Sequence, residues 1–185
     1  MPKKTSVLVT MLLILFVSVS SVFAINNVIS VSASPYAIQS YSSSLETKAT
    51  SNYGFGAKAG YRYHIGLFLL GADVSFQNYR YTINEKLVTL NNLRVLAKVG
   101  GKVALSEQLD LNGDIGAGIN MGLSRVSTNF NFTFGASGSV SYYLNPKLAL
   151  VGGADVYFEW PKAKNSEYKA FLLSIVSTIG VEMNL

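Results

Sequence analysis

The chain contains no cysteine among its 185 residues. It therefore has no disulfide framework, no thiolate metal site and no cysteine to which a lipid anchor could be attached. Charged residues are also scarce, at 14% of the chain, whereas ordinary soluble domains contain about 25%. The mean hydropathy is +0.30. The low charge indicates that part of this protein lies in a solvent other than water.

Long apolar runs are missing beyond the N-terminal segment. The most apolar later stretch, 170–179, is interrupted by Ser174, Ser177 and Thr178, and a spanning helix needs about 20 apolar residues. Lipid accepts only helices and closed sheets, because every backbone hydrogen bond must be made internally. A chain with little charge and no such helix is therefore expected to enter a membrane as a closed β-barrel.

The first residues have the pattern of a secretory signal peptide. Lys3 and Lys4 precede the apolar run 7–17, and small residues then lead to Ala24. We predict a cleaved signal peptide over 1–24 and one barrel domain over 25–185. An uncleaved anchor is the alternative, and it is disfavoured because the run is shorter than the about 20 residues of a spanning helix.

Strict alternation is the strongest signal in the rest of the chain. Between Leu109 and Leu123 the odd positions are mostly apolar, and the even positions are Asp, Asn or Gly. A period of two puts these sets on opposite faces of a strand long enough to cross a membrane. Similar patterns predict eight strands, at 27–38, 52–63, 67–79, 91–104, 109–123, 129–143, 148–159 and 169–185. Pro35 is expected to break the ladder of the first strand.

The connections alternate between two kinds. Those near Ile65, Ser106 and Pro146 are short, whereas those near Ser44, Glu85, Val126 and Asn165 are generally longer and polar. Short periplasmic turns and longer extracellular loops are typical of outer-membrane barrels. The sequence thus predicts an all-β fold, an eight-stranded antiparallel up-and-down transmembrane β-barrel after the signal peptide. A secreted soluble barrel is disfavoured, because polar faces rich in Gly, Ser and Asn would solubilise it poorly.

Eleven charged residues fall on the face that such a barrel turns inward. Opposite charges nearly balance, and buried ions are tolerated when they are paired, so we interpret them as a network that fills the lumen. The rival interpretation makes them the selectivity residues of a pore. The set is Lys58, Arg62, Asp73, Arg94, Lys98, Lys102, Asp110, Asp114, Asp155, Glu159 and Glu182.

No motif for catalysis, a cofactor or a metal survives inspection. The glycines of 54–60 and 116–122 alternate within strands, so they are not nucleotide-binding loops. The spacing of Asp110, Asn112 and Asp114 lacks the glycine and the glutamate of a calcium loop. The single histidine, His64, has no adjacent nucleophile and is interpreted as a solvated turn residue. We expect no enzymatic activity.

The predicted outer loops have a basic balance. They could attract an extracellular anionic ligand, although ordinary solvated charge is the favoured explanation. No basic tract interleaved with aromatic residues suggests nucleic acid. The candidates are Arg80, Lys86, Arg125, Lys162 and Lys164.

The alternating strands, the turn Tyr-Tyr-Leu-Asn-Pro-Lys-Leu-Ala-Leu at 142–150 and the strand segment Gly-Ala-Asp-Val at 153–156 make the chain resemble the small outer-membrane β-barrel family of OmpA and OmpX type. The resemblance implies a multi-pass protein in the outer membrane of a diderm bacterium, in contact with lipid. It also implies periplasmic chaperones and the barrel-assembly machinery as partners during biogenesis. Family members usually end in an aromatic residue, where this chain has Leu185.

Three functions follow from these observations. The first is a non-enzymatic barrel with a structural or adhesion-like surface role, its lumen plugged by paired charges. The second is a small porin-like pore or transporter for ions or amphiphiles. The third is a soluble barrel that binds an apolar ligand.

Overall fold

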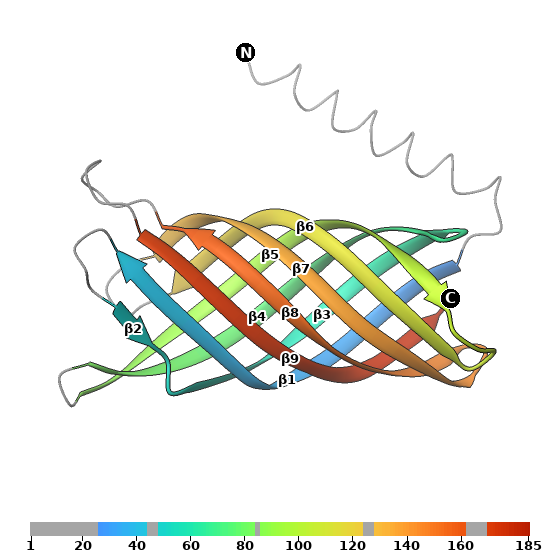
Figure 1. Cartoon of the computed structure of the whole chain (residues 1–185), viewed down its shortest axis with the longest axis horizontal. Helices are drawn as coiled ribbons and strands as arrows, with labels where there is room; N and C mark the ends of the chain where they lie inside the picture. The colour runs from blue at the N-terminus through green and yellow to red at the C-terminus, as the bar shows by residue number, and fades with distance from the viewer. Residues whose placement is uncertain (1–25, 44–47, 84–85, 124–127, 162–169) are drawn as a thin grey trace, which may run out of the picture.

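The computed structural model describes residues 26–43, 48–83, 86–123, 128–161 and 170–185. These residues form one antiparallel sheet that closes into a barrel, with the chain winding around it strand by strand (Figure 1). No helix among them is long and apolar enough to cross a membrane. The predicted signal peptide, 1–24, lies outside the described residues.

The strands follow the chain order in the sheet, with one exception near the start. Nine strands are formed by the described residues. They are β1 (Asn26–Ser43), β2 (Lys48–Thr50), β3 (Tyr53–Ile65), β4 (Phe68–Ile83), β5 (Lys86–Ala104), β6 (Leu109–Leu123), β7 (Thr128–Asn145), β8 (Leu148–Trp160) and β9 (Ala170–Asn184). Pairing of β1 with β9 closes the barrel.

The short strand β2 was not predicted, and it extends the wall made by β3. Both strands pair with the same edge of β1, through Ser40 with Thr50 and through Ala37 with Gly54. Between them the backbone amide of Ser51 donates to Gln39 O at 2.8 Å. Because β2 and β3 occupy one place in the wall, the barrel is eight-stranded, and the predicted fold class is confirmed.

Alternation sorts the side chains as the sequence predicts. On β6, Leu111, Ile115 and Ile119 are about half exposed on the outer surface, while Asp110 and Asp114 are buried inside. Around the barrel the exterior is apolar and the interior is polar. Soluble proteins have the reverse arrangement, with apolar side chains inside. Transmembrane barrels have this arrangement, and it is the opposite of what a soluble carrier with an apolar cavity requires.

Pro35 breaks the regular ladder of the first strand, as predicted, but the predicted end of that strand at 38 is wrong. β1 continues to Ser43, and its register against both neighbours shifts by one residue around Pro35 and Tyr36. This β-bulge absorbs the residue without an N–H, and the Tyr36 carbonyl accepts a bond from Ser177 Oγ at 2.9 Å. The extra residue also exchanges the faces, so that even positions point inward up to Ser34 and odd positions from Ala37 onward.

The two ends of the barrel differ. At one end, here called the turn end, the strands are joined by the short connections 66–67, 105–108 and 146–147. Gly66 has a φ of 60° there, a conformation that suits glycine. At the other end, the loop end, β4 and β5 pair as far as Ile83 with Lys86. The longer loop predicted near Glu85 is therefore mostly strand.

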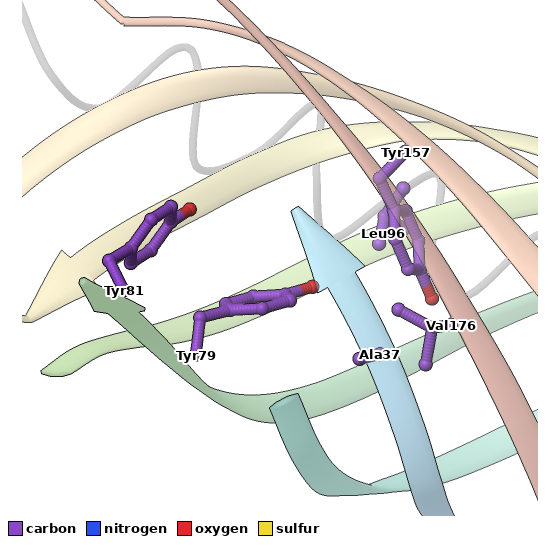
Figure 2. Close-up of a cluster of buried hydrophobic side chains, with 6 residues drawn as sticks. All are labelled: Ala37, Tyr79, Tyr81, Leu96, Tyr157 and Val176. Atoms are coloured by element: carbon purple, nitrogen blue, oxygen red, sulfur yellow. The ribbon is translucent and has the colours of Figure 1, made fainter. Parts of the chain in front are cut away.

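A group of buried apolar and tyrosine side chains occupies the loop-end half of the interior. Figure 2 shows the tyrosine rings pointing into the barrel from the inner wall. The cluster is built from four strands besides β1, and its residues Tyr79 and Tyr157 lie against the guanidinium of Arg94. Its members are Ala37, Tyr79, Tyr81, Leu96, Tyr157 and Val176.

Candidate functional site

The candidate site is the set of charged side chains inside the barrel. Most of them recur at intervals of four along a strand, as in Lys58 and Arg62 of β3 or Asp155 and Glu159 of β8. Residues separated by four lie on the same face of a strand. Their rise of about 13 Å along the strand places them at different depths. The sequence thus builds the network in layers along the barrel axis.

The middle layer joins two lysines to three aspartates. Lys58 Nζ lies 2.7 Å from one carboxylate oxygen of Asp155 and 2.9 Å from the other. Lys98 Nζ lies 2.8 Å from Asp73 and 2.9 Å from Asp114. Because β3 and β8 are separated in the wall by β1 and β9, the Lys58–Asp155 pair joins strands that do not touch.

The layer nearest the turn end is built around Arg62. Its guanidinium pairs with Glu182 of β9 and lies 3.9 Å from Asp114 of β6. Lys102 completes the layer 3.0 Å from Asp110, with 23% of its side chain exposed. Since β3 and β6 have β4 and β5 between them, the contacts of Arg62 connect opposite parts of the interior.

Arg94 forms the layer toward the loop end. Its side chain and that of Glu159 are both 0% exposed, and Arg94 Nε lies 2.5 Å from Glu159 Oε1. Asn120 Nδ2 donates to the second oxygen of Glu159 at 2.6 Å. The guanidinium also stacks 4.6 Å from the Tyr157 ring centroid and donates to Ser174 Oγ at 3.1 Å. The ion pair is thus desolvated and held on several sides.

A small cavity lies between the middle layer and the layer nearest the turn end. This cavity, of about 10 Å³, lies between Lys58, Arg62, Asp155 and Glu182, which is room for about one water molecule. All eleven inward charges predicted from the sequence lie within the interior, each in at least one ion pair. The described residues contain no group of three or more His, Asp or Glu side chains placed to hold a metal ion.

The interpretation of His64 as a solvated turn residue is wrong. β3 runs to Ile65, so His64 keeps the inward parity of Arg62, and it is only 6% exposed. Its Nδ1 has no hydrogen-bond partner among the described residues.

The predicted basic loop residues are only partly described. Arg80 lies on the outer face of β4, and Lys86 pairs through its backbone with Ile83. The positions of Arg125, Lys162 and Lys164 lie outside the described residues. The inner tyrosines were not singled out from the sequence, although continued alternation from Asp73 places Tyr79 and Tyr81 on the same inward face.

The closed antiparallel sheet, the apolar exterior and the ion-paired interior define a transmembrane β-barrel of the smallest common size. Its fold is that of the small outer-membrane β-barrels. Neisserial surface protein A is 18% identical, with a TM-score of 0.58 over 86% of this chain and 97% of that chain. OprG from Pseudomonas aeruginosa is 9% identical, with a TM-score of 0.55 over 86% of this chain and 96% of that chain.

No family model matches the sequence, and no curated protein matches it either. The structural likenesses establish the fold, which confirms the predicted resemblance to small outer-membrane barrels.

Proposed function

We propose that this protein is a non-enzymatic, multi-pass barrel of the outer membrane of a diderm bacterium. Its interior is closed by paired charges, and its loop end is the working surface. The observation that carries the proposal is the set of ion pairs that span the interior, above all Arg94 with Glu159 and Lys58 with Asp155. Both of these pairs join strands that are not neighbours in the wall.

The energetics of the pairs support a plug. Breaking one buried pair leaves an uncompensated charge at a cost of about 3–5 kcal/mol. An ion that passed along the axis would have to separate pairs in three successive layers. The interior of an eight-stranded barrel is just wide enough for its own side chains. A rigid, sealed scaffold that displays loops is the role that fits these facts.

A small pore or transporter is the second candidate. It is favoured by buried polar atoms that have no hydrogen-bond partner among the described residues, such as Asn92 Nδ2, Asn131 Oδ1 and Thr133 Oγ1. Such atoms bind water readily, and they extend a polar lining toward the loop end. In that case the inward charges would act as selectivity residues.

Single-channel recording in planar bilayers separates these candidates. The mature chain is refolded, its folded state is verified by heat-modifiable migration in gels, and its conductance is recorded. We expect no channel openings from the wild-type protein. We expect transient openings from the double variant Lys58→Ala with Asp155→Ala, which removes one crossing pair without stranding a charge. Stable wild-type openings would refute the plug and support the pore.

The surface role rests on the basic residues near the loop end. The anionic ligand that they favour is a polyanion such as a sulfated or phosphorylated polysaccharide. Retention of whole folded protein on dextran sulfate, compared with a variant carrying Lys162→Gln and Lys164→Gln, tests this role. Binding that is weak and unaffected by the substitutions would count against it.

A further inference from the structure

One charged side chain lies on the outer wall of the barrel, among the strand side chains that the structure describes. Arg80 extends outward from β4, where the preceding outward residues are Ala72, Val74, Phe76 and Asn78. The other charged strand residues whose side chains the structure describes are the eleven inward ones, and each of them is ion-paired. Arg80 has no carboxylate within ion-pair distance in the described part of the chain.

Aromatic rings of β3 hold the guanidinium against the wall. Its central carbon lies 5.1 Å from the Tyr53 ring centroid and 5.9 Å from that of Phe55. Arg80 Nη1 donates to Tyr53 Oη. Tyr53 and Arg80 are direct partners in the β3–β4 ladder. These contacts fix the position of the guanidinium. Among the described residues, only one of its five N–H donors has an acceptor.

The character of the outer wall changes at the depth of this site. On β4 the outward residues switch from Phe76 to Asn78, and on β5 they switch from Leu93 to Asn91. Asn78 Nδ2 donates to Asn91 Oδ1 at 2.6 Å, across the two strands. Thr89 lies directly opposite Arg80 in the ladder and is exposed. The change from apolar to amide and hydroxyl groups marks the edge of the hydrocarbon layer.

A charge on the lipid-facing surface is costly at the bilayer centre and costs little at its edge. At that edge the abundant anions are the phosphates of lipid headgroups. The planar guanidinium matches two phosphate oxygens at once, more closely than an ammonium does. The aromatic rings below it supply the amphipathic surface typical of membrane interfaces.

We propose that Arg80, seated on Tyr53 and Phe55, binds the phosphate of an anionic lipid headgroup in the leaflet at the loop end of the barrel. The proposal rests on the proposed membrane location, and it adds a specific lipid contact to it. Thr89 and the Asn78–Asn91 pair lie beside the phosphate position as further polar groups.

Lipid binding by folded protein in neutral detergent micelles tests this assignment. The probes are phosphatidylglycerol, phosphatidylcholine and inorganic phosphate, and bound lipid is counted by native mass spectrometry. We expect phosphatidylglycerol to bind wild type in preference to phosphatidylcholine. We expect Arg80→Gln to weaken that binding at least tenfold and Arg80→Lys to weaken it less. Lys147→Gln, which removes a positive charge at the turn end, serves as the matched control and should bind like wild type.

Three results would overturn the proposal. They are equal binding by wild type and Arg80→Gln, an equal loss in Lys147→Gln, and displacement of the lipid by inorganic phosphate at equal concentration, which would indicate a free-phosphate site. Folding of each variant is verified by heat-modifiable migration. Because the assay uses micelles, it remains informative if the protein fails to insert into vesicles, a failure that would count against the membrane location instead.

Discussion

At the scale of single residues, Arg94 has interior contacts of several kinds: an ion pair, hydrogen bonds and ring stacking. It is fully buried, it pairs with Glu159, and it lies against Tyr157. We predict that Arg94→Ala lowers the free energy of unfolding by about 3–5 kcal/mol, because the carboxylate of Glu159 then stays buried without a counter-ion. Urea denaturation of the folded protein in micelles measures this loss.

A matched double variant identifies the cause of that loss. Arg94→Met combined with Glu159→Gln removes both charges and keeps most of the volume, so it should recover stability relative to Arg94→Ala. If Arg94→Ala unfolds at the same urea concentration as wild type, the buried pair contributes nothing, and the plugged interior loses its main support.

Two glycines of neighbouring strands make a second comparison at this scale. A Cβ at Gly118 would lie 1.9 Å from the Val95 carbonyl oxygen, whereas a Cβ at Gly138 would meet nothing within 4 Å. We predict that Gly118→Ala destabilises the barrel by about 1–3 kcal/mol through the forced backbone shift, and that Gly138→Ala changes it little. Denaturation curves of the two variants measure this difference. Equal unfolding midpoints for Gly118→Ala and Gly138→Ala would refute the steric argument.

At the scale of the strand, alternation predicts the regular strands well and fails at the bulge of β1. Alternation alone predicts β6 with its observed bounds and β8 to within one residue, because each residue there follows one period. The bulge at Pro35 and Tyr36 changes the period within β1, and periodicity contains no signal for the extra residue. The depth of His64 was missed for a related reason, since it depends on how far β3 extends before its turn.

The bulge itself is testable. Beyond it, Gln39 points inward and its Nε2 donates to Ser174 Oγ at 3.0 Å. Deletion of Pro35 together with Tyr36 would make Ala37 follow Ser34 directly, which should reverse the faces of 37–43 and bury the wrong side chains; deletion of Tyr36 alone would restore plain alternation and keep those faces. We therefore predict little or no heat-resistant folded band for the double deletion. Pro35→Ala keeps the residue count, and it should fold normally; failure of both variants would show that the proline ring, and not the count, is what matters.

At the scale of the whole molecule, closure of the barrel through the β1–β9 pairing determines which charged side chains form ion pairs. The sequence places the inward charges on the correct face, but the pairs join strands that lie up to three positions apart in the wall, as with Arg94 of β5 and Glu159 of β8. Such partners depend on the stagger with which the sheet closes. Alternation within one strand has no information about that stagger, so the pairing could not be predicted.

Closure is open to direct measurement because the chain has no native cysteine. Val31 of β1 and Val181 of β9 are direct ladder partners on the outer face. We predict that Val31→Cys with Val181→Cys forms a disulfide on oxidation, since paired positions have suitable Cα separations. The cross-link would alter migration of the unfolded chain in gels. Val31→Cys with Val140→Cys on distant β7 should not cross-link; if it does, or if the seam pair does not, the strand order is wrong.

The buried ion pairs also shape how this protein responds to heat. The hydration of ions becomes less favourable as temperature rises, so the penalty for keeping Lys58, Arg94 and their partners away from water shrinks on warming. A core held by apolar contacts alone has no such penalty to lose. The ion pairs of the interior should therefore contribute relatively more to stability at the high temperatures where ordinary domains unfold.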